Sequence, residues 1–365
     1  MSISRREALR NMAFLTGAMA CPAPSAIERE QLHQALYWHA SGNDIQCDLC
    51  PHACLLSKGR TGICRNRQNR NGELVALGYG LPCAINVDPI EKKPLYHFLP
   101  GSRAYSFAVG GCNLRCKNCQ NYTISQTSPL ETGATYRSPQ SLVDEAKKAG
   151  VASIAYTYSE PSVWFEYMLD VAKCARRNGL KNVLVTSGYI NPKPFEELAP
   201  CLDGAHIDCK SFDDTIYRNL NAGKLKPVLD TILLAKKKGV WVEIINLIVP
   251  EWSDDYAMIR KMAVWIRENA GVDVPLHFSR FFPLYQLVQL YPTPTDVLLK
   301  AREIAREEKL SYVYIGNVPE IDSDTHCVHC NALLIKRTGY KVTVTGMKGS
   351  TCSKCGARVP GVWKE

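Results

Sequence analysis

The stretch Gly110–Ser125, GGCNLRCKNCQNYTIS, holds three cysteines whose spacing suits metal chemistry. Cys112, Cys116 and Cys119 follow a C-x3-C-x2-C pattern and supply three thiolates. A closed tetrahedral metal site or a fully ligated four-iron cluster takes four ligands. Three thiolates can hold three irons of such a cluster and leave the fourth iron open to a small molecule. The alternative is a zinc knuckle whose fourth ligand lies elsewhere in the chain.

A second cysteine group lies near the carboxyl end of the sequence. It consists of two C-x2-C pairs, Cys327 with Cys330 and Cys352 with Cys355. Two such pairs are typical of a zinc ribbon. Four thiolates close the coordination shell, so we expect a structural metal. Zinc is the expected ion, and a single iron is the alternative because it accepts the same four-thiolate geometry.

A third group, with the spacing C-x2-C-x3-C-x9-C, consists of Cys47, Cys50, Cys54 and Cys64. Four thiolates in this pattern either close a zinc site or hold an auxiliary four-iron cluster. An auxiliary cluster would relay electrons or contact a substrate, whereas zinc would only fold a small lobe. The residues themselves leave this choice open, and cysteines without any metal are a third interpretation. His52 is expected to lie outside the ligand set.

Composition narrows the function classes. Sixteen cysteines in 365 residues are many, but disulfide scaffolds are usually short chains, so the paired spacings favour metal sites. The net charge is +9, with Lys and Arg spread along the chain rather than interleaved with aromatic residues. We therefore expect no nucleic-acid binding. No apolar run reaches the ~18 residues that a membrane span needs.

Apolar, β-branched runs alternate with helix-like stretches from about residue 104 onward. The runs cover residues 105–110, 153–158, 182–187, 205–210, 240–249, 275–281 and 312–316. This alternation predicts an α/β fold in which parallel strands are joined by crossover helices, either as a partial barrel or as a curved open sheet. Chemistry in such folds sits at the C-terminal ends of strands. The cysteine triplet directly follows the first run.

The triplet on the loop after a first strand resembles the hallmark of radical S-adenosylmethionine (SAM) enzymes. The resemblance implies a partial parallel (β/α) barrel with a [4Fe–4S] cluster on Cys112, Cys116 and Cys119. It further implies that the open iron chelates SAM. One electron, supplied by a low-potential donor, would then cleave SAM and release a 5′-deoxyadenosyl radical.

Residues 156–161, YTYSEP, are similar to the Gly-Gly-Glu-Pro element of that superfamily. The similarity implies that Ser159 and Glu160 meet the amino group of SAM. Members usually carry an aromatic residue just before the third cysteine, near the adenine. This chain has Asn118 there, so Asn118 is the implied adenine neighbour.

Residues 206–210, HIDCK, resemble the Asp-x-Lys motif of pyruvate formate-lyase activating enzymes, which makes Asp208 and Lys210 the implied catalytic pair. Over about residues 35–365, the order of motifs is similar to the radical SAM enzyme of the AmmeMemoRadiSam system. That resemblance implies AMMECR-like and Memo-like partner proteins without naming a substrate. The expected target is a glycyl residue of a partner enzyme, or another residue or metabolite handled by those partners. His277 and Arg280, near the end of the sixth run, are expected to face the site.

The first residues conflict with this chemistry. Arg5 and Arg6 precede a mildly apolar stretch and resemble a twin-arginine export signal, although a short cytoplasmic amphipathic helix is the alternative. An exported enzyme would lack a supply of SAM and of low-potential electrons, so we narrowly favour a cytoplasmic location.

The expected organisation has four parts: a leader or tail at 1–30, a four-cysteine lobe at 31–103, the partial barrel at 104–318 and a ribbon-like unit at 319–365. The main hypothesis is a radical SAM oxidoreductase that abstracts a hydrogen atom, as glycyl-radical enzyme activases do. A non-catalytic iron–sulfur or zinc module for electron transfer or protein interaction is the alternative.

Overall fold

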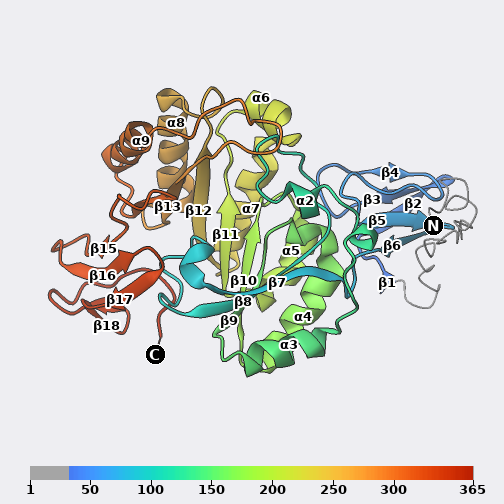
Figure 1. The fold of residues 1–365 in the computed structure, drawn as a ribbon, viewed down its shortest axis with the longest axis horizontal. Coiled ribbons are helices and arrows are strands. Elements are labelled where there is room, and N and C mark those ends of the chain that lie inside the picture. The colour runs from blue at the N-terminus through green and yellow to red at the C-terminus, as the bar shows by residue number, and fades with distance from the viewer. Residues whose placement is uncertain (1–32, 365) are drawn as a thin grey trace, which may run out of the picture. The chain divides into compact units, whose positions relative to one another are not determined.

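The structure, a computed structural model, describes residues 33–364, and the predicted leader at 1–30 lies outside them. Its centre is an eight-stranded sheet with the order β14-β13-β12-β11-β10-β9-β8-β7, shown in Figure 1. All neighbouring strands are parallel except the antiparallel pair β7 and β8. The strands are β7 (Pro82–Pro89), β8 (Arg103–Val109), β9 (Ser153–Tyr156), β10 (Lys181–Thr186), β11 (Gly204–Asp208), β12 (Trp241–Ile248), β13 (Leu276–Arg280) and β14 (Val313–Gly316).

All seven runs predicted from the sequence are strands of this sheet, and consecutive strands lie side by side. The mostly parallel α/β fold is therefore confirmed. Within residues 33–364, β7 and β14 each have one hydrogen-bonded neighbour, so the sheet is open at both edges. Parallel strands in this order need a crossover after each strand.

Helices provide these crossovers and bury apolar faces on the sheet. In α4, for example, Phe165, Met168, Val171 and Ala172 recur at helical spacing and are all buried. The α-helices are α2 (Tyr122–Ser125), α3 (Pro139–Lys148), α4 (Phe165–Arg177), α5 (Pro192–Leu198), α6 (Asp214–Ile216), α7 (Leu225–Lys237), α8 (Tyr256–Trp265) and α9 (Thr295–Glu307). Short 3-10 turns are η2 (Ile90–Lys92), η3 (Pro129–Glu131), η4 (Pro161–Trp164) and η5 (Ala199–Cys201), and π-helical turns are η6 (Tyr217–Asn221) and η7 (Ile266–Ala270).

The segment before β8 has two structural roles. Its first part is the edge strand β7, and its last part binds a buried carboxylate of β12. The Glu243 carboxylate accepts hydrogen bonds from the backbone N–H groups of Tyr96 (3.0 Å) and His97 (2.8 Å). His97 also contacts the carbonyl of Pro360 through Nδ1, at 2.7 Å. The segment therefore ties the carboxyl end of the chain to the central sheet.

The first cysteine group lies in two small antiparallel sheets of three strands each, with the orders β1-β6-β5 and β2-β3-β4. Their strands are β1 (His33–Gln34), β2 (Trp38–Ser41), β3 (Asp44–Cys47), β4 (Leu55–Leu56), β5 (Arg67–Arg70) and β6 (Glu73–Ala76). Apolar side chains of these sheets, including Ile45 and Leu74, share one core cluster with Phe107 and Trp164 of the main body. These sheets therefore pack against the main body through apolar side chains.

The last cysteine group lies in two further antiparallel sheets, β15-β16-β17 and β18-β19. Their strands are β15 (Thr325–His326), β16 (Leu333–Thr338), β17 (Lys341–Val344), β18 (Met347–Lys348) and β19 (Thr351–Cys352). Figure 1 shows these sheets and the N-terminal ones on opposite sides of the central sheet. No helix among the described residues has the length and apolar character needed to cross a membrane.

Candidate radical and metal sites

The cysteine triplet lies on the loop that leaves the C-terminal end of β8. Gly111 opens this loop with a φ of +100°, a conformation that residues with a Cβ rarely adopt. Its N–H donates to the carbonyl of Ile124 at 2.9 Å. A Cβ built on Gly111 would lie 2.4 Å from the carbonyl oxygen of Cys64. Glycine is therefore required both by the turn and by the close approach of the N-terminal lobe.

Two backbone hydrogen bonds hold the middle of the triplet loop. The N–H groups of Arg115 and Lys117, on either side of Cys116, donate to the carbonyls of Asn221 and Leu220, both at 2.9 Å. These carbonyls end the π-helical turn η6, a type of turn that is frequent at functional sites. The Asn221 side chain is fully buried, and neither its nitrogen nor its oxygen has a partner within the described residues. Asn221 lies in no motif of the sequence analysis and was not predicted.

The predicted pair Asp208 and Lys210 lies at the C-terminal end of β11, close to the triplet loop. Lys210 Nζ donates to Asp208 Oδ2 at 2.8 Å, and His206 Nε2 lies 2.9 Å from Asp208 Oδ1. Burial alone would raise the pKa of Asp208, but Lys210 and His206 outweigh it and hold this pKa well below its usual value. The carboxylate is therefore ionised at neutral pH. Burial raises the pKa of the Cys116 thiol, and the nearby Lys210 ammonium partly opposes that effect.

His206 is a residue that the motif analysis missed. Its Nδ1 lies 2.7 Å from the carbonyl of Lys93, while its Nε2 faces the Asp208 carboxylate. Both partners are acceptors, so both hydrogen bonds form only when the ring carries two protons. His206 precedes Asp208 by two residues in one strand, and this spacing puts both side chains on the same face of a sheet. This spacing could have identified His206 as a site residue from the sequence.

Ser159 and Glu160 follow β9, at the same end of the sheet. Ser159 Oγ donates to the carbonyl of Val109 at 2.6 Å. The Glu160 carboxylate is buried and accepts from Thr186 Oγ1 (2.6 Å) and from the Ser187 hydroxyl (2.7 Å) and N–H (2.8 Å). Burial, followed by the proximity of Glu160, raises the pKa of the Cys112 thiol well above its usual value. Glu160 therefore lies close to the triplet while it cross-links β9 to β10.

This bonding predicts that Glu160→Ala destabilises the fold. The variant leaves the donors of Thr186 and Ser187 buried without an acceptor, which costs about 2–4 kcal/mol in the free energy of unfolding. Chemical denaturation under anaerobic conditions measures this loss. Glu196→Ala is the matched control because Glu196 makes only an exposed ion pair with Lys238, at 3.0 Å. Equal effects of the two substitutions would contradict the assigned cross-link.

The residues around the triplet fit an iron–sulfur cluster. Three thiols come from one loop, and burial keeps the Cys112 and Cys116 thiols protonated until a metal displaces the protons. Within residues 33–364, Asn118 Oδ1, Asn113 Oδ1 and both polar atoms of Asn221 are buried without a protein partner. A group bound at the three thiols would provide hydrogen-bond partners for these unpaired polar atoms.

Asn118, the predicted adenine neighbour, is buried in the triplet loop. His277 was expected to face the site but is buried in a different set of contacts. It is the second residue of β13 and contacts Glu243 through Nε2 at 2.7 Å, so it belongs to the buried network near the start of the strand. Arg280 does end β13, where its Nε donates to the carbonyl of Thr293 at 2.9 Å.

The C-terminal cysteines form a compact group suited to one metal ion. The sulfurs of Cys327 and Cys355 are 3.6 Å apart, and those of Cys330 and Cys352 are 3.7 Å apart. A tetrahedron with Zn–S bonds of ~2.3 Å places its sulfurs about 3.8 Å apart. Within residues 33–364, this group alone gathers three or more potential ligand atoms within 4.8 Å of one another. The four predicted cysteines therefore come together in a group that could hold a metal ion, and its geometry does not choose between zinc and iron.

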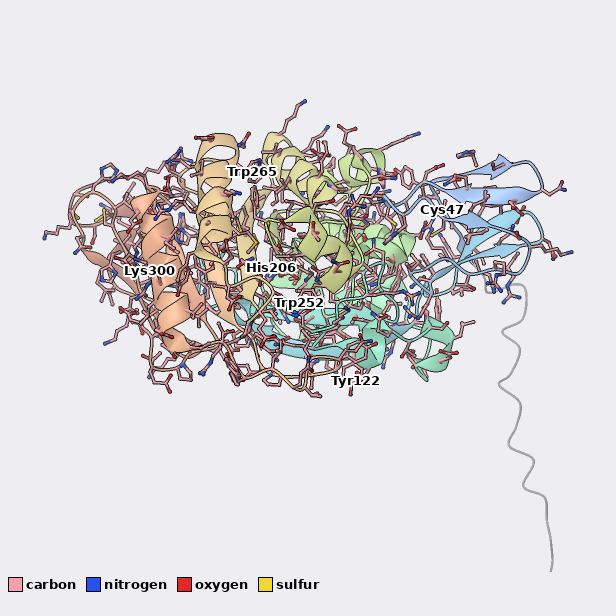
Figure 2. The ribbon with its side chains drawn as sticks, turned by 90° about the horizontal axis from the view of Figure 1, so that it is seen from above. Cys47, Tyr122, His206, Trp252, Trp265 and Lys300 are labelled. Atoms are coloured by element: carbon pink, nitrogen blue, oxygen red, sulfur yellow. The ribbon has the colours of Figure 1, made fainter. Side chains whose placement is uncertain are left out.

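The N-terminal cysteines are arranged differently. They line a small enclosed cavity together with apolar side chains and Arg67. Figure 2 marks Cys47 in this lobe and His206 on the central sheet. Burial raises the pKa of the Cys50 thiol and raises that of Cys64 to about 11. These thiols are therefore neutral at pH 7 unless a metal displaces their protons.

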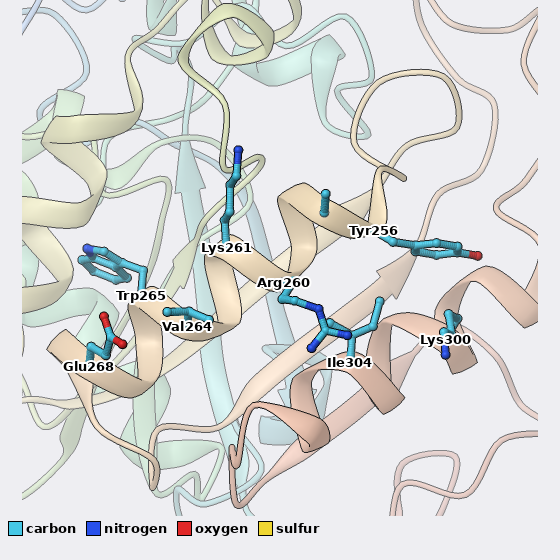
Figure 3. A pocket seen from close by; sticks show the side chains of 9 residues that line it. Tyr256, Arg260, Lys261, Val264, Trp265, Glu268, Lys300 and Ile304 are labelled. Atoms are coloured by element: carbon cyan, nitrogen blue, oxygen red, sulfur yellow. The ribbon is translucent and has the colours of Figure 1, made fainter.

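A surface groove lies away from the cysteine sites. It runs along α8 and α9, as Figure 3 shows, and contains none of the predicted site residues. Its lining is Tyr256, Ala257, Arg260, Lys261, Val264, Trp265, Glu268, Lys300 and Ile304. The groove is mainly apolar, and nothing in the described residues indicates what would cover it.

Comparisons with known proteins agree with the placement of the triplet. Residues 108–263, which include the triplet and the Asp208–Lys210 pair, match the family described as the Radical SAM superfamily. This chain contains a radical SAM superfamily domain. Such a domain implies a [4Fe–4S] cluster and SAM, and proteins of the superfamily are generally oxidoreductase-like enzymes.

Relatives of this radical SAM protein include one long match and several distant ones. Uncharacterized protein MJ0808 of Methanocaldococcus jannaschii is 42% identical over 332 residues, which cover 90% of this chain and 99% of that protein. The Pyruvate formate-lyase-activating enzyme of Clostridium pasteurianum is 28% identical over 178 residues, or 48% of this chain and 73% of that enzyme. The Putative glycyl-radical enzyme activating enzyme MJ1632 of Methanocaldococcus jannaschii is 25% identical over 221 residues, or 57% of this chain and 76% of that protein. The similarity to activating enzymes is thus distant.

Proposed function

We propose that this protein cleaves SAM reductively at a [4Fe–4S] cluster held by Cys112, Cys116 and Cys119, and uses the radical to abstract a hydrogen atom. The observation that carries the proposal is the position of three thiols on one loop, beside Lys210 and Glu160, with no fourth cysteine in their spacing. When bound, the cluster and SAM supply a 5′-deoxyadenosyl radical after transfer of one electron.

In this proposal, the protein's own residues hold and orient the reactants. The three thiolates hold the cluster, and Gly111 allows the loop to lie against the lobe. Lys210, which bonds the ionised Asp208, presents a positive charge beside Cys116. Asp208 in turn is fixed by His206, so the pair is held in one geometry. Glu160, Ser159 and Asn118 are the proposed contacts for SAM.

The finer assignment is to an activase-like enzyme of the AmmeMemoRadiSam type. The order of motifs over about residues 35–365 and the distant similarity to activating enzymes support it. Under this proposal the protein takes electrons from a low-potential donor and acts on a protein substrate handled with AMMECR-like and Memo-like partners. In this proposal, residues 104–318 form the catalytic partial barrel. The lobe at 31–103 and the ribbon-like unit at 319–365 are accessory to it.

One anaerobic assay tests the proposed function against a non-catalytic role. The reconstituted protein is reduced with dithionite and incubated with labelled SAM, and 5′-deoxyadenosine is measured by chromatography. We expect product that depends on both reductant and protein. A module that only transfers electrons or binds partners would take up iron and give no product. Candidate partner proteins, added to the same mixture, would reveal the acceptor through transfer of label or formation of an organic radical.

Lys210 is expected to affect SAM cleavage without affecting iron binding. Lys210→Met removes the ammonium group beside Cys116 and should lower the rate of 5′-deoxyadenosine formation by at least about tenfold, a loss typical of a residue that orients reactants. Iron content should stay at the wild-type level. Lys226→Met is the control because Lys226 is 82% exposed on α7 and pairs only with Asp230. An unchanged rate, or a rate that falls in proportion to iron, would argue against this role.

A further inference from the structure

The N-terminal thiols lie too far apart to coordinate a single ion together as they are placed. The C-terminal sulfurs approach to 3.6 and 3.7 Å, as one tetrahedral ion requires. The N-terminal thiols instead surround an enclosed cavity, and no three of them lie within 4.8 Å of one another. The sulfurs of Cys112, Cys116 and Cys119 likewise do not all lie within 4.8 Å of one another. A group with several metal atoms separates its thiolate ligands further than one ion does, so the spread of these sulfurs favours an iron–sulfur cluster over zinc.

Arg67 provides an independent sign that a group belongs in this cavity. Its side chain is only 1% exposed and lies in the cavity wall. Nη1 donates to Glu166 Oε1 at 2.8 Å and Nη2 donates to the carbonyl of Leu36, but Nε has no partner within the described residues. An unpaired, buried N–H on a cation is costly. A cluster with four thiolates carries excess negative charge and has sulfur acceptors, and so would satisfy Nε.

The lobe also touches the triplet loop at its first residues. The Cys64 carbonyl abuts Gly111, where a Cβ would lie only 2.4 Å from the oxygen. Asn66 Nδ2 donates to the carbonyl of Gly110 at 3.0 Å, and His52 Nε2 contacts the carbonyl of Asn113 at 2.7 Å. A path from the Cys64 sulfur to the Cys112 sulfur therefore runs through covalent bonds and crosses a single non-bonded contact.

We propose that Cys47, Cys50, Cys54 and Cys64 hold a second [4Fe–4S] cluster, which relays electrons to the cluster on the triplet. The relay part rests on the proposed function. The second cluster accepts one electron from a low-potential flavodoxin-type or ferredoxin-type protein and is reduced from the 2+ to the 1+ state. It then returns to 2+ as it reduces the triplet cluster from 2+ to 1+. No proton or bond changes hands in the transfer.

Metal content and electron paramagnetic resonance (EPR) test the site without any turnover. Anaerobically reconstituted wild-type protein should hold about eight irons in the two clusters, in addition to the C-terminal ion. The triple variant C112A/C116A/C119A should keep about four irons and a reducible signal. Full reduction of the wild type should give a spin-coupled, broadened EPR spectrum that the triple variant lacks. Zinc in the N-terminal site, with about four irons in the wild type and none in the triple variant, would overturn the proposal.

The relay is tested by comparing two reductants. Cys54→Ala, at a half-buried ligand, should lower SAM cleavage at least about tenfold with reduced flavodoxin and much less with dithionite, which is small enough to reach the triplet cluster directly. Cys83→Ala is the control because Cys83 lies outside all three groups and its thiol contacts only the carbonyl of Ala108, at 3.5 Å. An equal loss with both reductants would overturn the relay. Eight irons without SAM cleavage by any reductant would instead reject the proposed function and leave the second cluster in place.

Discussion

Replacing any one of Cys112, Cys116 and Cys119 with Ala should reduce 5′-deoxyadenosine formation below detection, a loss of about three orders of magnitude or more. Each thiolate holds one iron, and the triplet has no spare cysteine to replace a lost ligand. The remaining two thiolates would hold a damaged cluster or none. The assay is the anaerobic measurement of product per folded protein, with circular dichroism to verify that the variant is folded.

Cys174→Ala is a suitable control for this series. Cys174 is buried in α4, and its thiol donates to Gln140 Oε1 at 3.2 Å rather than to any other cysteine. The substitution should lower stability slightly and leave product formation per folded molecule near the wild-type level. If a triplet variant kept product formation under reducing, anaerobic conditions, the open-cluster assignment would be wrong.

The second large effect concerns stability. Cys352→Ala should lower the melting temperature by about 10 °C, since an incomplete four-thiolate shell loses metal-binding energy that is also folding energy. Cys352 is 1% exposed and shares a buried cluster with Tyr312 and Tyr314 of the central body. The damage should therefore extend beyond the small sheets themselves. Product formation per folded molecule should change far less.

Ser353→Ala is the matched control because Ser353 is the exposed neighbour of Cys352. Differential scanning calorimetry in the presence and absence of a chelator separates the contribution of the metal from that of the side chain. A Cys352 variant with normal stability and strongly reduced turnover would indicate a redox or substrate role for the C-terminal site.

The seven predicted strands could be found because each is a short, largely buried run rich in apolar and β-branched residues, as in β10 and β12. The edge strand β7 escaped prediction because it begins with Pro82 and ends with Pro89, and proline in a strand is tolerated only at an edge, an end or a bulge. An edge position is a property of the assembled sheet and does not appear in the local sequence.

Some residues of the candidate site could likewise be predicted from the sequence, and others could not. The triplet and the Asp208–Lys210 pair can be recognised from the spacing of their residues. Counting the predicted strands then places the triplet on the loop after β8 and the pair at the end of β11. His277 was misplaced because the sequence does not show how far along β13 the residue lies. The position of Asn221 and the contact between Cys64 and Gly111 both arise where segments that are distant in sequence lie close together in the fold. No local sequence pattern predicts such contacts.

The hydrogen bond between His97 and the Pro360 carbonyl joins residues 263 positions apart. During synthesis at roughly 5–20 residues per second, His97 would wait about 13–50 s before Pro360 emerges from the ribosome. Until then the backbone N–H groups of Tyr96 and His97 can find Glu243, but the segment lacks its C-terminal partner. In the nascent chain, the contact between the segment and the C-terminal residues is therefore missing until synthesis is nearly complete. Contacts between residues so far apart in sequence slow folding. Chaperone dependence, and sensitivity of the yield to translation rate and growth temperature, are the consequences expected in a heterologous host.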